Sequence, residues 1–167
     1  SSLKAEEHAM RKLRAINNLI IACFSIKKYE AVFSCLEKIK GIESNSINSV
    51  VKIFVMNCTY ELALYTRLGE FDKGIKMIPE IEKGLRKYKG KYVNSDEVTF
   101  YEAISLIYFG KGKYKEALLY SNKILNYQDI MQRVDSYSLA LIINLMIHFE
   151  LGNAELLEYT VKTTYRF

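Results

Sequence analysis

Apolar side chains recur at helical spacing along nearly the whole chain. Between residues 48 and 68, Val51, Val55, Leu62 and Tyr65 are separated by four, seven and three positions, close to whole turns of an α-helix. Alternating apolar and polar runs bounded by tight turns, the signal of β-hairpins, are nearly absent. The pattern therefore predicts an all-α fold with eight helices, at about residues 3–26, 29–40, 46–68, 71–88, 95–110, 114–126, 130–151 and 154–167.

A single proline interrupts this pattern. Pro79 lies inside the segment predicted to be helical at 71–88. Proline removes the backbone hydrogen bond to the residue four positions earlier, here Ile75, and disfavours helix at the residue before it, here Ile78. We therefore expect a kink or a break at Pro79, with the basic segment from Lys83 to Lys91 as a looser tail.

The turns between the predicted helices repeat. Each second helix of a pair opens on an anchor residue, and the four anchors Tyr29, Phe71, Tyr114 and Ala154 are 42, 43 and 40 positions apart. Three anchors are aromatic, and three follow a Gly by two positions. A period of about 40 residues with one helix pair per unit predicts a helical-repeat stack. The units cover about residues 1–42, 43–92, 93–128 and 129–167 of a single domain.

One turn carries the best match to a known repeat. It resembles the tetratricopeptide-repeat (TPR) family in the segment Gly112-Lys113-Tyr114-Lys115-Glu116-Ala117-Leu118. Two other turns resemble the family less closely: Leu68-Gly69-Glu70-Phe71 and Leu151-Gly152-Asn153. The resemblance implies a right-handed α-α superhelix, a TPR-like solenoid of about four antiparallel helix hairpins. The chain departs from the family because its period exceeds the usual length of about 34 residues and because no Pro follows the second helices.

The resemblance also implies an inner, concave surface lined by the first helix of each pair. When the helices are aligned with the repeat pattern of the family, eight residues are expected to face that surface: Arg14, Asn17, Met56, Thr59, Arg67, Glu102, Ile142 and Met146. Four residues, each six positions before an anchor, are expected to pack against the partner helix instead: Cys23, Tyr65, Tyr108 and His148.

Composition narrows the class of protein. Half of the 167 residues are apolar, 26% are charged and one is Pro, which excludes a disordered or collagen-like chain. The net charge of +5 permits contact with an acidic partner without requiring one. The cysteines, three in number and without CxxC spacing, argue against a disulfide scaffold. We therefore expect a cytoplasmic protein.

Targeting signals are not evident in the sequence. The longest apolar stretch, Leu139–Phe149, is far shorter than the roughly 20 residues that span a membrane. The first fourteen residues are charged throughout, unlike a signal peptide, and lack an initiator Met. We expect no membrane partner, and we expect this sequence to be a piece of a longer protein.

Residue patterns for catalysis are weak. The histidines, His8 and His148, lie near opposite ends of the chain, and neither has an evident nucleophile beside it. CxxC, HxxxH and HExxH spacings are absent, as are the phosphate-binding loops GxxxxGK[ST] and GxGxxG. The sequence therefore predicts that the protein is not an enzyme and uses no metal or cofactor.

Basic residues offer an alternative. One cluster comprises Lys83, Arg86, Lys87, Lys89 and Lys91, interleaved with Tyr88 and Tyr92. Lys4, Arg11, Lys12 and Arg14 form a second cluster. Such groups can hold phosphates and stack bases, although a run of charges is more often a solvated helix face. Nucleic-acid binding is therefore a lesser hypothesis.

The function favoured by the sequence is a non-catalytic interaction scaffold. We expect a peptide or partner domain along the concave face, with apolar anchors and with polar specificity from Arg14, Arg67 and Glu102. The main alternative is a signal-responsive regulatory domain that controls an attached output domain. Open repeat ends would also allow self-association. The sequence does not identify the partner, because one repeat fold hosts many functions.

Overall fold

The computed structural model describes residues 2–127 and 134–165, and these form eight α-helices without a strand. The all-α prediction is confirmed. The helices are α1 (Ser2–Ser25), α2 (Tyr29–Lys40), α3 (Ile47–Leu68), α4 (Phe71–Lys87), α5 (Asn94–Gly110), α6 (Tyr114–Leu125), α7 (Val134–Glu150) and α8 (Ala154–Tyr165). The predicted start of the seventh helix at 130 and the predicted end of the eighth at 167 lie outside the described residues.

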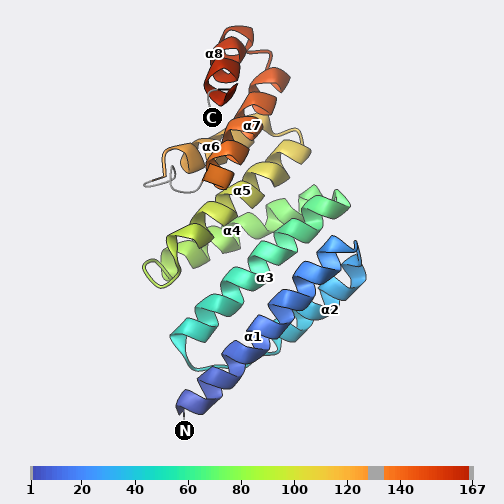
Figure 1. The fold of residues 1–167 in the computed structure, drawn as a ribbon, viewed down its shortest axis with the longest axis vertical. Helices are drawn as coiled ribbons and strands as arrows, with labels where there is room; N and C mark the ends of the chain where they lie inside the picture. The colour runs from blue at the N-terminus through green and yellow to red at the C-terminus, as the bar shows by residue number, and fades with distance from the viewer. Residues whose placement is uncertain (1, 128–133, 166–167) are drawn as a thin grey trace.

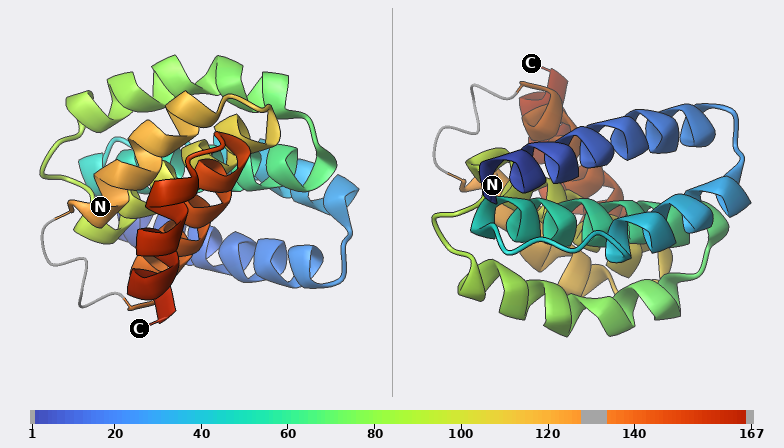
Figure 2. Two further views of the ribbon diagram at one scale, coloured as in Figure 1. Left: turned by 90° about the horizontal axis from the view of Figure 1, so that it is seen from above. Right: turned by 90° about the horizontal axis from the view of Figure 1, so that it is seen from below.

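The helices form a stack of pairs, with α1 at one end of the long axis and α8 at the other (Figure 1). Each odd-numbered helix packs on the helix that follows it and on the next odd-numbered helix, and each even-numbered helix from α2 to α6 packs on the next odd one. Seen along the stack, α1 and α4 lie on opposite sides of α3 (Figure 2). We call the surface formed by α1, α3, α5 and α7, on the side away from their partner helices, the odd-helix face.

The turns inside the pairs share one backbone geometry. Lys27, Gly69, Gly112 and Gly152 have left-handed φ values of 57°, 70°, 74° and 70°, and each precedes its anchor by two positions. The next residue donates its N–H to the carbonyl six positions before the anchor in every turn, as in Lys28 to Cys23 (2.9 Å) and Lys113 to Tyr108 (2.9 Å). This is the Schellman arrangement, which satisfies helix-end carbonyls. The sequence repeat is therefore a repeat of backbone structure, with Lys27 standing where the other turns have Gly.

Two large apolar clusters hold the stack together. One joins α3, α4, α5 and Tyr120 of α6, and the other joins α1, α2 and α3. Smaller clusters fix α7 against α5 and α6. The residues expected to face partner helices are buried (Cys23, His148) or half-buried (Tyr65, Tyr108).

Close approach of α4 to its neighbours depends on two glycines. A Cβ at Gly84 would lie 2.1 Å from Cζ of Phe54, and a Cβ at Gly74 would lie 2.4 Å from Cδ1 of Ile107. Real Cβ atoms do not tolerate such distances, because protein interiors are packed as densely as organic crystals. These two positions therefore let a side chain from α3 and one from α5 press against the α4 backbone.

Of the kink or break expected at Pro79, the break does not occur, since α4 is one continuous helix from Phe71 to Lys87. Pro79 is exposed, whereas its neighbours Ile78 and Ile81 are buried in the α3–α5 cluster. The carbonyl of Ile75, which has no N–H partner at Pro79, can accept a hydrogen bond from water. Packing of Ile78 and Ile81 on both sides of the proline keeps the helix continuous. The basic residues Lys83 to Lys87 are consequently helical rather than a loose tail.

Candidate functional site

The eight residues expected on the concave face do not share one degree of exposure. Arg14, Arg67, Ile142 and Met146 are exposed, Asn17, Thr59 and Glu102 are half-buried, and Met56 is buried. Met56 is 3% exposed and belongs to the α1–α3 cluster, so it supports the surface from below rather than projecting from it.

A cavity of about 270 Å³ opens between α1 and α3 on the odd-helix face. We call it the α1–α3 pocket. It is lined by Met10, Leu13, Arg14, Asn17, Asn18, Lys52 and Met56. Three of these, Arg14, Asn17 and Met56, are among the eight candidates from the sequence. The other four were missed, although Lys52 could have been found because it precedes Met56 by one helical turn.

Hydrogen-bond donors dominate the rim of the α1–α3 pocket. Arg14 and Lys52 are exposed, and no described carboxylate forms an ion pair with either. The side-chain oxygen of Asn17 accepts a 2.6 Å hydrogen bond from the Tyr60 hydroxyl, which leaves the Asn17 amide group as a donor. Burial raises the pKa of Tyr60, so its phenol stays protonated and keeps this orientation.

The floor of the pocket is apolar and none of its described lining residues is acidic. Leu13 and Met56 are 1% and 3% exposed, and Met10 is half-buried. Two cations and amide groups over a methionine-rich floor suit a ligand with an anionic head and a short apolar stem.

Arg67 and Glu102 do not line this pocket. Arg67 lies in the last turn of α3, fifteen residues from Lys52, which corresponds to about 22 Å along the helix axis. Glu102 lies on α5 and is half-buried. The structure therefore assembles part of the candidate set in one place and distributes the rest along the face.

A second hollow of about 440 Å³ lies between α7, α8 and the end of α5, and we call it the α7–α8 groove. Its lining is almost entirely apolar: Phe109, Leu145, Met146, Phe149, Glu150, Leu157 and Val161. Met146 was expected on this face from the sequence. The exposure of Phe149 was not, because an apolar run from Leu139 to Phe149 is usually a sign of a helix buried on every side.

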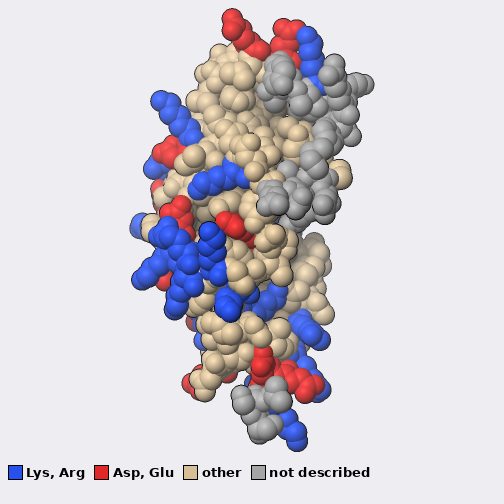
Figure 3. All heavy atoms as spheres, turned by 90° about the vertical axis from the view of Figure 1, so that its left-hand side faces the viewer, with Lys and Arg blue, Asp and Glu red and all other residues tan. Residues whose placement is uncertain are grey.

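The basic residues of α4 and the α4–α5 turn are all exposed. Figure 3 shows Lys and Arg side chains gathered midway along this side of the molecule. None of the five predicted residues forms an ion pair with a described carboxylate: Lys83, Arg86, Lys87, Lys89 and Lys91. We call these five residues the basic patch.

The aromatic residues within the basic patch serve packing. Tyr88 is half-buried, with its ring 5.4 Å from that of Phe54, and the Lys87 ammonium lies over the Tyr88 ring. Tyr92 is half-buried and donates a 3.2 Å hydrogen bond to the carbonyl of Leu85. The structure thus does not offer these two rings as open stacking platforms.

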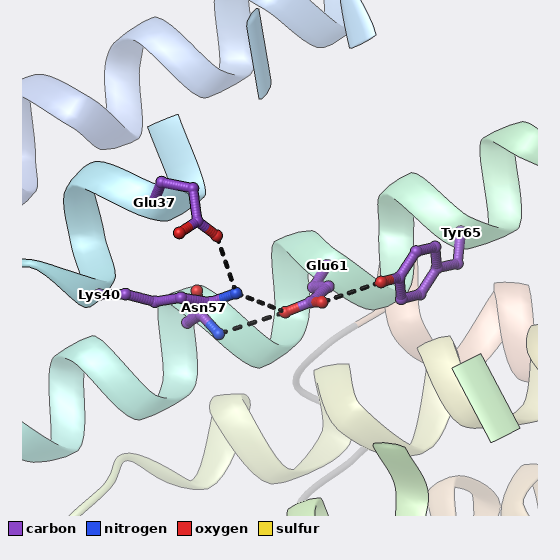
Figure 4. Close-up of polar contacts among 5 residues, drawn as sticks. All are labelled: Glu37, Lys40, Asn57, Glu61 and Tyr65. Carbon is purple, nitrogen blue, oxygen red and sulfur yellow. Dashed lines mark hydrogen bonds and ion pairs between the residues drawn. The ribbon is translucent and has the colours of Figure 1, made fainter. Parts of the chain in front are cut away.

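A polar cluster joins α2 and α3 around Glu61 (Figure 4). The Glu61 carboxylate accepts hydrogen bonds from the Tyr65 hydroxyl at 2.9 Å and the Asn57 amide at 3.3 Å, and Lys40 lies 3.7 Å away. Lys40 also bonds Glu37 at 3.1 Å. Because three donors already converge on Glu61, this carboxylate orders the helix interface.

Potential nucleophiles and bases are not brought together. All three cysteines are buried and free. Burial, with Glu61 and Glu80 nearby, raises the pKa of Cys58 to about 12, and burial beside Cys23 also raises that of Cys35. A reactive thiol needs a lowered pKa, so neither Cys58 nor Cys35 is activated as a nucleophile.

The histidines occupy different environments. His148 is buried, with Nδ1 3.1 Å from the Asn153 amide nitrogen, and His8 is exposed near the other end of the stack. Within residues 2–127 and 134–165, no group of three or more His, Cys, Asp and Glu side chains could hold a metal ion. None of the helices in this part of the chain is both long and apolar enough to cross a membrane.

Comparisons with protein-family models, curated proteins and solved structures found no match to this chain.

Proposed function

We propose that this chain is a non-catalytic interaction domain that binds an acidic segment of a partner protein in the α1–α3 pocket. The observation that carries the proposal is the convergence of Arg14, Lys52 and the Asn17 amide group on one cavity. Charge-assisted hydrogen bonds from such donors are about twice as strong as neutral ones. An Asp or Glu side chain, or the terminal carboxylate of a peptide, supplies the matching acceptor.

The stacked arrangement supports a TPR-like solenoid as the architecture behind this function. Each pair packs on the next through the same combination of helices, and four turns share one geometry. A right-handed superhelix with the odd-helix face as its inner surface belongs to this proposal. The free, buried thiols suit the cytoplasmic location that we propose.

Binding of a labelled peptide rich in Asp and Glu, measured by fluorescence anisotropy, tests the proposal. Arg14→Glu and Lys52→Glu should each weaken binding about tenfold or more, which corresponds to ~1.4 kcal/mol. The matched control is Lys115→Glu, the same charge change at an exposed position on α6 that does not line the pocket. It should bind like the unmodified protein.

Two results would count against an acidic partner segment in this pocket. One is equal binding by Arg14→Glu, Lys52→Glu and the unmodified chain. The other is equal loss in all three variants, because net charge rather than the pocket would then control binding. A peptide with an amidated C-terminus distinguishes side-chain carboxylates from the terminal carboxylate as the bound group.

Nucleic-acid binding is a second candidate, favoured by the basic patch, whose charges form no ion pair with a described carboxylate. Because Tyr88 and Tyr92 are engaged in packing, the patch would contact phosphates without stacking bases. Binding of a single-stranded oligonucleotide that weakens steeply with salt, and is lost in a Lys87→Glu/Lys91→Glu variant but kept in Arg14→Glu, would support this candidate.

A further inference from the structure

The α7–α8 groove continues into an exposed apolar seam on α7. Leu139, Ile142, Met146 and Phe149 follow one another at intervals of three, four and three residues and are 36%, 47%, 44% and 71% exposed. Val161 of α8, 47% exposed, lines the groove beside Phe149. This is the spacing of a helix–helix seam. No described helix covers it, and a contiguous apolar surface of this kind marks an interaction site.

A second exposed seam runs along α1. Ala15, Leu19 and Ala22 of α1 and Ile26, in the turn directly after it, are exposed and are spaced by four, three and four residues. Leu19 and Ile26 are 47% and 61% exposed. Each seam is about 15 Å long, from the helical rise per residue. The α1 seam alternates small and large side chains, whereas the α7 seam has only large ones, so the two are complementary in shape.

The segments that contain the two seams carry opposite net charge. Between residues 4 and 28 there are six basic and two acidic side chains, and two of the basic ones, Arg11 and Lys12, flank the α1 seam. Between residues 134 and 165 there are four acidic side chains and one lysine. Glu150 lines the groove itself, and Lys162 is paired with Glu158. A basic apolar helix therefore fits the groove better than an acidic one does.

We propose that the α7–α8 groove of one molecule receives the α1 seam of a second copy of this chain. Phe149 then packs over Ala22, between Leu19 and Ile26, and Arg11 and Lys12 beside the α1 seam approach the acidic residues of α7 and α8. The contact is heterologous, because different surfaces of the two copies meet. Such contacts build open chains or closed rings.

The proposal is independent of peptide binding in the α1–α3 pocket. The pocket uses Arg14, Asn17 and Asn18 of α1, which are not members of the seam. A failure of self-association would leave peptide binding untouched, and the reverse also holds.

Sedimentation velocity over a wide range of protein concentration tests the contact. We expect the average mass of the unmodified chain to rise with concentration. Phe149→Glu and Leu19→Glu should each remain monomeric, since each removes one of the two surfaces. An equimolar mixture of the two variants should form a heterodimer and stop there, because it contains one intact groove and one intact α1 seam. Leu119→Glu, at a 56% exposed position on α6, is the matched control and should assemble normally.

Three results would overturn the proposal. An unmodified chain that stays monomeric at every concentration excludes the contact. Dimerisation by Leu19→Glu alone would show that two α7 seams meet symmetrically. The third result is a mixture of the variants that remains monomeric, although both variants have the circular dichroism spectrum and the melting temperature of the unmodified chain. It would show that the two surfaces do not bind each other.

Discussion

The α1–α3 pocket and the α7–α8 groove both lie beside first helices of repeat pairs, yet they differ in chemistry. The pocket places Arg14, Lys52 and asparagine amides over a floor that belongs to the protein core. The groove has one charged lining residue, Glu150, and walls that are largely exposed surface. The two ends of the stack therefore offer different chemistry, because the side chains that meet at each hollow decide what it can bind.

The largest expected difference concerns stability. Leu13→Ala should lower the free energy of unfolding by about 2–5 kcal/mol, because Leu13 is 1% exposed and its removal leaves a cavity under the pocket. Met146→Ala in the groove should change it by less than about 1 kcal/mol, since Met146 is 44% exposed. Urea unfolding followed by circular dichroism measures the free energy of unfolding of both variants. Similar losses in the two variants would contradict the view that the pocket floor belongs to the core and the groove wall does not.

The second expected difference between the two sites is how strongly binding at each depends on salt concentration. Peptide binding in the α1–α3 pocket is expected to weaken several-fold from low to high ionic strength, because exposed cations are screened. Self-association through the groove should weaken less, since apolar burial supplies most of its driving force. Anisotropy and sedimentation in the same buffers provide the comparison, and parallel salt curves would argue that one kind of force drives both events.

A smaller effect is expected from the residue that orients Asn17. Tyr60→Phe removes the 2.6 Å hydrogen bond to Asn17 and should cost about 0.5–1.5 kcal/mol of stability. It should also weaken peptide binding while leaving self-association unchanged, because the Asn17 amide group loses its fixed orientation. Unchanged peptide affinity in a folded variant would remove Asn17 from the binding site.

The smallest effect belongs to the polar cluster around Glu61, which joins α2 and α3, and it depends on pH. Burial and the hydrogen bond to Glu61 raise the pKa of Tyr65 from 10.0 to about 12. Because the pKa of Tyr65 is higher in the folded state than in the unfolded state, its protonated phenol contributes to the free energy of unfolding fully below pH 10. This contribution is lost as pH rises from 10 toward about 12. Tyr65→Phe should therefore lose less stability than the unmodified chain over this interval. Identical alkaline unfolding curves would contradict the role assigned to this phenol.

The sequence predicted the helices well because their signals are local. Apolar spacing located the eight helices, and the positions two residues before the anchors, three of them Gly, marked turns that share one geometry. The break allowed for at Pro79 did not occur, because packing of Ile78 and Ile81 on either side of the proline overrides a local preference.

The candidate sites were less predictable, since they depend on which residues of neighbouring helices meet. Registration on the odd-helix face found Arg14, Asn17 and Met56 but not Lys52. Periodicity assigns a residue to a helix face, but it does not say which rim of a cavity that residue completes. Phe149 was missed for a related reason, because apolar sequence alone does not reveal that a helix lacks a neighbour on one side.

The composition of α4 sets an order for folding. Gly74, Pro79 and Gly84 make this helix roughly 5 kcal/mol less favourable than one with alanine at those positions, so α4 is not expected to persist alone. Its fit against Ile107 requires α5, which is synthesised later. During translation α4 should therefore emerge after α3 but before α5, which completes its packing, and its contacts should form late, with low φ-values at Ile78 and Ile81.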